Sequence, residues 1–573
     1  MMKMTISDVE RMYEFGELTL RQMWNNVKEK AKLYRDKNIW IHILTDEEIE
    51  PYICKLEKTP VGSLPLWGIP FAIKDNIDLA GIPTTAACPE FSYVPENSAF
   101  VVEQLIKAGA IPVGKTNMDQ FATGLVGTRT PYGEVHNAYK DELISGGSSS
   151  GSAVAVALDI VSFALGTDTA GSGRVPAALN NIVGWKPSIG AWSNRGVVPA
   201  CESIDCVTVF TKNVDDAERV DAVARVYDEK YRYARAIPYV NTKSLKKIYL
   251  PGKEPVFYGD YKESYIKKWN QIKKCIETTY KNVEYIDTTE LSEAASILYD
   301  GPWVAERYAG LKDYLDKKAE TLFPVTKAII CGAAQEDKSA VDLFQAMHRL
   351  ADIKMHIHKM LEESVLIMPT NGGTFTRDQV DCDPVATNSK MGLYTNHCNL
   401  LDLCAINVPV GFAEEGVPMG ITVFSKSGNE GLNVTFGRTI SDKMRSYIDL
   451  AVFGLHLKGF SLESQLIDLG AEYKETVKTA PEYRMYSLNT VPRKPGVVKD
   501  ISNGAALEMD IWSIPREKIG SFLELLPEPL GLGKITTSDG NEMIGFICQD
   551  YAIDTAEDIT EFGGWRKYTQ IAL

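Results

Sequence analysis

The chain has few histidines, no excess of positive charge and no long apolar run. Its 573 residues include seven histidines, and acidic residues outnumber basic ones to give a formal net charge of -15. Because phosphate binding draws most of its affinity from clustered lysine and arginine, this charge argues against a nucleic-acid partner. No apolar run approaches the roughly 18 residues that a membrane span requires, and the first residues lack the apolar core of a signal peptide. We therefore expect a cytoplasmic protein that acts on a small substrate, with no nucleic-acid or membrane partner.

The cysteines and histidines give no sign of a disulfide framework or a metal site. The ten cysteines are widely scattered without a Cys-x-x-Cys pair, which is typical of buried thiols in a reducing compartment. His356 and His358 are two positions apart on an expected helix, so they point to different faces and do not suit a shared metal ion. We expect no metal and no cofactor.

The pattern of apolar residues predicts a large α/β domain followed by a smaller α+β domain. Residues 7–34 show helical spacing, and strand-like runs such as WGIPFAIK then alternate with helical runs such as AFVVEQLIKAG. Residues 260–363 are rich in lysine and predict a mainly helical insertion. From about residue 450 the chain has short strands separated by turns, including RMYSLNTV, ALEMDIWSIP and EMIGFICQD. We place the two domains at residues 1–445 and 450–573.

The scarcity of histidine directs attention to a lysine and two serines. A serine attacks an amide only when another group accepts its proton, and histidine is the usual acceptor. Lys74, Ser148 in GGSSSGSAVAVAL and Ser172 in GTDTAGSGRVPA offer a lysine and a second serine in its place. A glycine/serine run is more often a flexible linker, but this one opens directly into AVAVALDIVSFALG, a stretch suited to a buried helix. The leading prediction is a histidine-free amide hydrolase.

The segment TDTAGS supplies successive backbone amides next to Ser172. An oxyanion can be stabilised by these backbone amides, which belong to Thr169, Ala170, Gly171 and Ser172 itself. Each such donor is typically worth about 2.7 to 4 kcal/mol. Gly171 permits the tight turn that this requires. Asp168 is either a supporting residue or a turn cap.

A competing motif, GAIPVGKT at residues 109–116, matches the pattern of a phosphate-binding loop and would indicate a nucleotide hydrolase. Such a loop lies between a strand and a helix, whereas here a helix precedes the motif and IPV is itself strand-like. We therefore expect a structural role for Lys115.

These motifs, in this order, resemble the amidase signature family. The resemblance includes IPFAIKDNID, VGKTNMDQFATG, the 24-residue step from Ser148 to Ser172 and GWKPSIGAWSNRGVVPACESID. It implies a mixed β-sheet flanked by helices, with Lys74 as an unprotonated base, Ser148 as a relay held by a cis peptide bond after Gly147, and Ser172 as the nucleophile. Burial behind the apolar strand IPFAI would lower the pKa of Lys74 enough for it to accept a proton near neutral pH.

One departure from the family pattern points to a branch of it. This chain has Gly173 where the family usually has a branched apolar residue, and that variant resembles the allophanate hydrolases. YDGPWVAERYAG, NSKMGLYTNHCNLLDLCAINVP, AVFGLHLKG and FGGWRKY extend the resemblance over nearly the whole chain. It implies hydrolysis of allophanate, which is urea bearing a carboxylate, to ammonia and carbon dioxide. Arg307 would grip the carboxylate and Tyr299 would donate from its phenol; a surface arginine and a packed tyrosine are the alternative.

The resemblance also concerns the second domain and the partners. C-terminal domains of allophanate hydrolases resemble the γ-glutamylcyclotransferase fold and are implicated in decarboxylating N-carboxycarbamate. His456 in FGLHLKG is the candidate for that step, and a packed core histidine is an equal alternative. The expected partner is a biotin-dependent urea carboxylase, either separate or fused, and a homodimer is one option for the assembly. Another amidase-signature enzyme such as a transamidosome glutaminase, or a non-catalytic scaffold, stays an open alternative.

Overall fold

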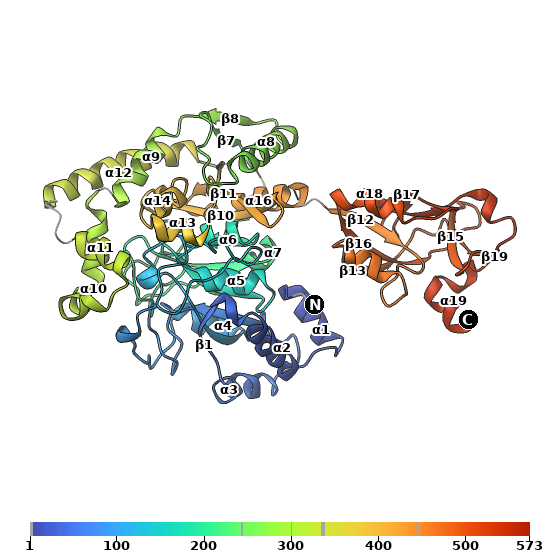
Figure 1. Ribbon diagram of the computed structural model, residues 1–573, viewed down its shortest axis with the longest axis horizontal. Coiled ribbons are helices and arrows are strands. Elements are labelled where there is room, and N and C mark those ends of the chain that lie inside the picture. Colours follow the sequence, from blue (N-terminus) through green and yellow to red (C-terminus); the bar gives the residue numbers. More distant parts are fainter. Residues whose placement is uncertain (1–3, 242–243, 300, 334–338, 445–446, 573) are drawn as a thin grey trace. The chain divides into compact units, whose positions relative to one another are not determined.

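Eleven of the described strands form one mixed sheet in the first part of the chain (Figure 1). The structure is a computed structural model, and it describes residues 4–241, 244–299, 301–333, 339–444 and 447–572. In spatial order the strands are β1 (Trp40–Ile43), β3 (Ile111–Thr116), β2 (Pro70–Lys74), β4 (Phe163–Asp168), β6 (Cys206–Thr211), β5 (Val183–Lys186), β10 (Leu403–Glu414), β11 (Val417–Lys426), β9 (Ser364–Pro369), β7 (Lys247–Pro251) and β8 (Val283–Ile286). Among the described helices, none is long and apolar enough to cross a membrane.

The centre of this sheet is buried on both faces, which explains the continuous apolar runs that the sequence shows there. Every residue of β2, β3, β4, β5, β6 and β9 is buried. β2 runs parallel to both β3 and β4, whereas β4, β6, β5, β10, β11 and β9 follow one another in antiparallel pairs. The predicted mixed sheet flanked by helices is confirmed.

The helices of this part cover the sheet and its edges. They are α1 (Ile6–Glu14), α2 (Leu20–Leu33), α3 (Asp46–Leu56), α4 (Phe100–Lys107), α5 (Ser150–Ala157), α6 (Val175–Leu179), α7 (Val214–Ala224), α8 (Lys262–Thr279), α9 (Thr289–Tyr299), α10 (Ala305–Lys318), α11 (Pro324–Ala333), α12 (Ala340–Met360), α13 (Arg377–Cys382), α14 (Ala386–Met391), α15 (His397–Leu400) and α16 (Glu430–Met444). α5 packs against β2, β4 and β6, α6 against β5, β10 and β11, and α16 against β10 and β11.

Two apolar stretches divide where the sequence suggested one helix. The first helix ends before Gly16, which has a left-handed φ of 71°, and α2 begins after Thr19, which forms a capping box with Gln22. In AVAVALDIVSFALG, α5 stops at Ala157, the chain turns through Asp159 at a φ of 56°, and the rest forms β4. Local turn geometry therefore separates apolar segments whose periodicity alone is ambiguous.

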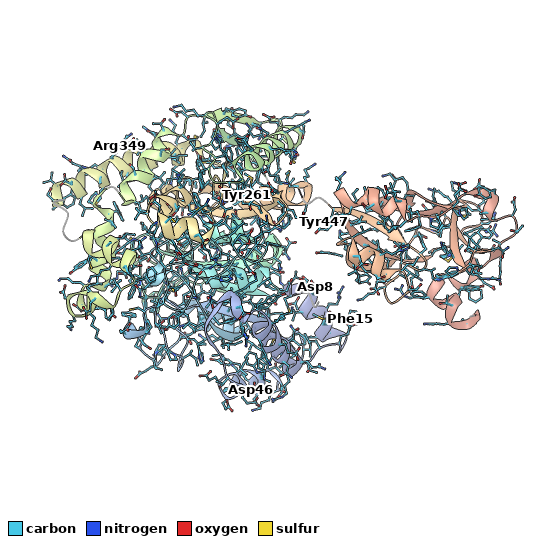
Figure 2. The ribbon with its side chains drawn as sticks, in the orientation of Figure 1. Asp8, Phe15, Asp46, Tyr261, Arg349 and Tyr447 are labelled. Carbon is cyan, nitrogen blue, oxygen red and sulfur yellow. The ribbon has the colours of Figure 1, made fainter. Side chains whose placement is uncertain are left out.

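The predicted helical insertion is confirmed, with the short strand β8 inside it. α8, with 18 residues, and α12, with 21, are the longest of the described helices in it. Arg349 of α12, labelled in Figure 2, forms two hydrogen bonds of 2.6 Å with the carboxylate of Glu293 in α9. This ion pair joins α9 to α12.

Residues 445–573 form a second compact unit with its own sheets and core. A five-stranded sheet has the order β13 (Glu472–Lys478), β16 (Glu508–Pro515), β12 (Tyr447–Val452), β18 (Glu542–Cys548) and β17 (Leu530–Thr536), and a three-stranded one has the order β15 (Lys494–Lys499), β14 (Tyr483–Leu488) and β19 (Glu557–Asp558). Its helices among the described residues are α17 (Glu463–Asp468), α18 (Ile519–Glu524) and α19 (Trp565–Ala572). The predicted α+β character and the strands at β14, β16 and β18 are confirmed.

Candidate active site

Lys74 and Ser148 meet inside the first unit. Lys74 is the last residue of β2 and is fully buried. Its Nζ lies 2.7 Å from Ser148 Oγ and 2.7 Å from Thr167 Oγ1. Because β2 and β4 are parallel, their carboxyl ends meet at one edge of the sheet, which places Thr167 beside Lys74. The peptide bond between Gly147 and Ser148 is cis, as the resemblance implies.

Burial lowers the pKa of Lys74 to about 7. The carboxylates of Asp119, Asp205 and Asp168 partly oppose this effect, and the positive charge of Arg307 adds to it. A neutral amine has two N–H donors and one lone pair, so Lys74 can donate to Thr167 while it accepts from the Ser148 hydroxyl. The site therefore suits a lysine that acts as a base near neutral pH.

Ser172 lies in the buried turn that follows β4. Its hydroxyl donates to the backbone carbonyl of Gly124 at 3.5 Å. Within the described residues, no hydrogen bond joins Ser172 to Ser148. Catalytic hydrogen bonds are often long or misaligned until substrate binds. The structure thus brings Lys74 and Ser148 together, and the contact between Ser148 and Ser172 stays a prediction.

The turn before Ser172 presents buried backbone amides. In the part of the chain that the structure describes, the amides of Thr169, Ala170 and Ser172 have no hydrogen-bond acceptor, although all three residues are at most 3% exposed. Buried amides normally have an acceptor, so three such donors in one turn suit a negatively charged oxygen. The Gly171 amide differs, because it donates to Asp168 Oδ1 at 2.9 Å.

The Asp168 carboxylate holds this turn in place through several hydrogen bonds. This favours a role for Asp168 in supporting the site over that of a simple turn cap. Its carboxylate accepts two hydrogen bonds from the Arg174 guanidinium, at 2.9 and 3.0 Å, and two more from the amides of Gly171 and Gly173. Burial alone would raise the pKa of Asp168, but the charge and hydrogen bonds of Arg174 outweigh it and hold that pKa below its ordinary value. A buried anion therefore organises the turn that carries Ser172.

Gly173, the departure from the family pattern, has a packing reason. A Cβ at this position would lie 2.7 Å from Thr208 Cγ2 and 2.8 Å from Thr208 Oγ1, both on the neighbouring strand β6. Contacts under 3.0 Å force something to move. The absence of a side chain at residue 173 therefore lets the turn lie close against β6.

Some residues that hold the Ser172 turn in place were not predicted from the sequence, because they lie far from that turn along the chain. Thr395 Oγ1 donates to the Ala170 carbonyl at 2.7 Å. The side-chain Nδ2 of Asn399 donates to the backbone carbonyls of Asp168 and Ile204, at 2.7 and 2.8 Å. Both lie in NSKMGLYTNHCNLLDLCAINVP, which the sequence marked only as a resemblance. No local pattern reveals which backbone carbonyl a threonine or an asparagine will reach.

Asp119 is a second buried aspartate, which the sequence did not single out, and it lies beside Ser148. Asp119 accepts hydrogen bonds from the amides of Val126, Gly127 and Arg129, at 3.3, 3.1 and 2.9 Å. Its own amide donates to the Ser148 carbonyl at 3.1 Å. The motif VGKTNMDQFATG thus contributes a carboxylate that fixes a loop beside Ser148. Asp119 is the one acidic residue of this motif, and that is the signal that would have found it.

Arg307 lies in the first turn of α10 and is 2% exposed. Its Nη1 donates to Thr123 Oγ1 at 3.1 Å and to the Ala122 carbonyl at 3.4 Å. Because its charge affects the pKa of Lys74, the guanidinium is close to the reactive groups, and the surface-arginine alternative is wrong. Tyr299 ends α9, and its side chain lies outside the described residues.

The phosphate-loop motif forms a buried strand rather than a loop. Residues 111–116 of GAIPVGKT form β3, and Lys115 is buried there in an ion pair of 3.2 Å with Asp75. Lys115 also donates to Thr84 Oγ1 at 2.9 Å, so its predicted structural role is confirmed. Across the described ranges, no group of three or more His, Cys, Asp and Glu side chains is arranged to hold a metal ion.

His456 in the second unit has the surroundings of a core histidine. The residue is 8% exposed, and its ring stacks on Phe546 at 5.3 Å and makes a T-shaped contact with Phe522 at 5.4 Å. Its Nε2 lies 3.0 Å from Gln465 Oε1, and burial lowers its pKa. These contacts support the packing alternative, and a catalytic role for His456 stays a prediction.

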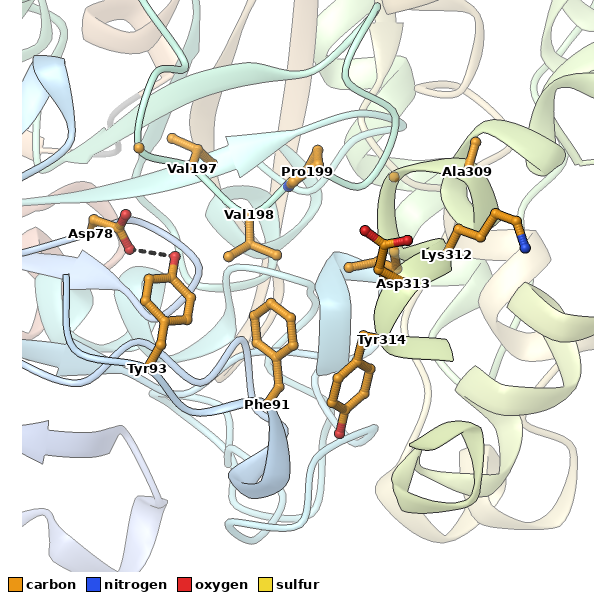
Figure 3. Close-up of a pocket in the computed structure, with 13 residues that line it drawn as sticks. Asp78, Phe91, Tyr93, Val197, Val198, Pro199, Ala309, Lys312, Asp313 and Tyr314 are labelled. Carbon is orange, nitrogen blue, oxygen red and sulfur yellow. Dashed lines mark hydrogen bonds between the residues drawn. The ribbon is translucent and has the colours of Figure 1, made fainter. Parts of the chain in front are cut away.

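A hollow of about 530 Å³ lies beside α10, and Figure 3 draws the residues that line it. Phe91, Tyr93, Val198 and Pro199 line one side, and residues 309–314 of α10 line the other. The Tyr93 hydroxyl donates to Asp78 Oδ1 at 2.7 Å. Lys74, Ser148 and Ser172 are not among the residues that line it.

Comparison with known proteins bears on the family. Residues 36–433 match the family model described as Amidase. The chain belongs to the amidase family. Residues 448–570 match a second model, the allophanate hydrolase C-terminal domain. The resemblance drawn from the motifs is confirmed.

Three relatives illustrate the range of amidase-family proteins that this chain resembles. The urea amidolyase of Saccharomyces cerevisiae is 42% identical over 581 residues, which cover 93% of this chain and 31% of that protein. One component of the glutamyl-tRNA(Gln) amidotransferase of Lactobacillus johnsonii is 32% identical over 458 residues, 74% of this chain and 93% of that one. The solved Kluyveromyces lactis allophanate hydrolase is 36% identical with a TM-score of 0.70 and covers 99% of both chains. The chain spans 31% of the length of each of two urea amidolyases.

Proposed function

We propose that this protein is an allophanate hydrolase that cleaves the terminal amide of allophanate in its first unit. The observation that carries the proposal is the hydrogen bond between buried Lys74 and Ser148, at 2.7 Å, with the pKa of Lys74 lowered by burial to about 7. The likeness to the Kluyveromyces lactis allophanate hydrolase over 99% of both chains gives independent support.

The chemistry follows from the positions of these groups. Neutral Lys74 accepts the Ser148 proton while Ser148 takes that of Ser172, whose oxygen attacks the carbonyl carbon of the terminal amide. The amides of Thr169, Ala170 and Ser172 stabilise the resulting oxyanion, and Gly171 joins them if its amide turns from Asp168. The C–N bond breaks, the nitrogen takes the proton back through the relay, and ammonia leaves. Water then hydrolyses the acyl ester on Ser172 and releases N-carboxycarbamate.

Recognition of the substrate carboxylate is assigned to Arg307. A guanidinium can bind a carboxylate with two parallel hydrogen bonds, and the buried setting strengthens that contact. Tyr299, at the end of the preceding helix, is the proposed second donor. Together they would select allophanate over amides that lack the negative charge.

The second unit and the cellular setting complete the proposal. We assign to the second unit the decarboxylation of N-carboxycarbamate to ammonia and carbon dioxide, supported by the match of residues 448–570 to the allophanate hydrolase C-terminal domain. Allophanate is carboxylated urea, so a biotin-dependent urea carboxylase, separate or fused, is the proposed supplier of the substrate. The protein would act in the cytoplasm, and a homodimer is the proposed assembly.

The test is substrate profiling with identification of products. Ammonia release is measured with allophanate, malonamate and glutamine, for the wild type and for Ser172→Ala. We expect the highest kcat/KM with allophanate, and a fall of at least about 10³-fold in Ser172→Ala, because removal of a nucleophile typically costs that much or more.

A glutaminase is the rival, because the amidotransferase component shares the family. Glutamine turned over faster than allophanate would reject the proposed substrate. Arg307→Lys tests the assigned carboxylate contact directly, since lysine cannot reproduce the two-pronged contact. It should raise the KM for allophanate.

A further inference from the structure

Two neighbouring side chains fix the first turn of α10. Glu306 accepts two hydrogen bonds from Ser203, one from its backbone amide at 2.8 Å and one from its hydroxyl at 2.7 Å. The next residue, Arg307, donates to Thr123 Oγ1 at 3.1 Å. Because each carboxylate oxygen of Glu306 accepts its own hydrogen bond, the carboxylate cannot turn without breaking one of them. We name this pair of bonds the Ser203–Glu306 clasp.

Ser203 belongs to a loop that also supports the oxyanion turn. Two residues later, Asp205 accepts a hydrogen bond of 2.5 Å from the Thr169 hydroxyl. Asp205 also accepts from the amide of Cys201, so the loop is closed on itself between the two contacts. The clasp therefore connects the helix that carries Arg307 with the turn that carries the oxyanion amides.

Apolar contacts also hold α10 in place. The helix borders the hollow of Figure 3, which residues 309–314 line together with Val198 and Pro199. Leu311 and Leu315 belong to the same apolar cluster as Val198, and Tyr308 and Tyr314 pack against it. Apolar contacts are non-directional, whereas two hydrogen bonds to one carboxylate set an orientation.

We propose that Glu306, through the Ser203–Glu306 clasp, is a positioning residue that aims Arg307 at the carboxylate of the substrate. This rests on the proposed function, because it assumes that Arg307 binds a carboxylate. A simpler role is available to an acidic residue in the first turn of a helix, where its negative charge stabilises the positive end of the helix dipole. The two roles make opposite predictions for two conservative variants.

Glu306→Gln keeps the length of the side chain and loses its charge. Its amide oxygen still accepts from the Ser203 backbone and its NH₂ group can donate to the Ser203 hydroxyl, so the clasp persists. Glu306→Asp keeps the charge and is one methylene too short to make both contacts. If the residue positions Arg307, Glu306→Gln behaves like the wild type and Glu306→Asp is impaired; a helix-dipole role gives the reverse order.

The measurement is KM and kcat for allophanate, with acetylurea as a matched probe in which an acetyl group replaces the carboxylate. For Glu306→Asp we expect the KM for allophanate to rise about tenfold with kcat changed little. A slightly misplaced Arg307 weakens the binding of the substrate and of the transition state by similar amounts, and such a uniform loss raises KM alone. Acetylurea, followed as a substrate or as a competitive inhibitor, should be unaffected. In an Arg307→Ala background, Glu306→Asp should add no further effect, because both changes remove one interaction.

Three results would overturn the inference. Equal loss of allophanate and acetylurea binding in Glu306→Asp would indicate a general structural role, and a larger defect in Glu306→Gln than in Glu306→Asp would indicate the helix-dipole role. Additive effects of Glu306→Asp and Arg307→Ala would show that the two residues act separately. If Arg307→Ala itself leaves KM for allophanate unchanged, the carboxylate contact of the proposed function fails as well, and that result is distinct from the other three.

Discussion

At the scale of single residues, the site contains buried ionisable side chains, and burying a charge without a partner costs free energy. Lys74 is fully buried next to two hydroxyl groups, with no carboxylate in direct contact among the described residues. Lys115, on the adjacent strand, is equally buried but has Asp75 at 3.2 Å. Desolvation acts on both lysines, and only the second has a direct counter-ion to favour its charged form. That difference separates a lysine suited to accept a proton from one suited to hold a structure.

The first prediction concerns the pH dependence of the wild type. Burial lowers the pKa of Lys74 to about 7, and only the unprotonated amine can accept a proton from Ser148. Activity should therefore be high above pH 7 and fall below it, by about tenfold for each further pH unit, because one essential group becomes protonated. The measurement is kcat/KM for allophanate as a function of pH.

Two lysine variants serve as controls for this profile. Lys74→Met should abolish activity, leaving no acid limb to measure. Lys115→Met removes the buried partner of Asp75, so it should lower the midpoint of thermal unfolding while the residual activity keeps its acid limb near the same pH. If the acid limb shifts in Lys115→Met and is still present in Lys74→Met, then Lys74 is not the base.

At the scale of elements, the turn that carries Ser172 follows β4 and lies against β6 without room for a side chain at residue 173. Gly173→Ala should destabilise the protein by about 1 to 3 kcal/mol, because an added methyl group in a tightly packed position forces the surrounding atoms to shift. The new Cβ would lie 2.7 Å from Thr208. Chemical denaturation measures the free energy of unfolding, and kcat should fall with it because the turn carries Ser172.

Matched variants show whether the cause is this contact. Adding Thr208→Ala to Gly173→Ala removes the atoms that the methyl group meets and should recover part of the lost stability. Gly332→Ala adds the same methyl group in α11, where nothing lies within 4 Å, and should be neutral or slightly stabilising. Stability unchanged by Gly173→Ala would refute the packing explanation for the glycine.

How much of the site the sequence predicts depends on how local its signals are. The lysine at the end of a strand and the glycine/serine turn before a helix are short patterns, and these patterns suffice to predict Lys74 and Ser148. The supporting bonds of Thr395 and Asn399 join segments more than 200 residues apart and have no such pattern. In the fold, the buried strands and the long amphipathic helices were predictable, whereas the break at Gly16 depended on one residue in a left-handed conformation.

At the scale of the molecule, the two units have separate hydrophobic cores. Residues 1–444 contain Lys74, Ser148, Ser172 and Arg307, and residues 445–573 contain His456 with a core of their own. A chain that ends at Met444 should therefore fold and retain the first step, because it keeps both the sheet and the supporting residues of the site. Division of the two steps between the units is then open to direct measurement.

The last prediction uses this division. With allophanate as substrate, the intact chain should release two ammonia molecules and carbon dioxide in step, because in the proposed function the second unit decarboxylates each N-carboxycarbamate that the first unit makes. The chain truncated after Met444 should release its first ammonia at a similar rate, while the second ammonia and carbon dioxide appear later, at the rate at which the intermediate decomposes in water. Adding residues 445–573 as a separate protein should restore the faster second phase. If the truncated chain releases both ammonia molecules as quickly as the intact one, the second unit has no part in decarboxylation. His456 then serves only to pack against Phe522 and Phe546.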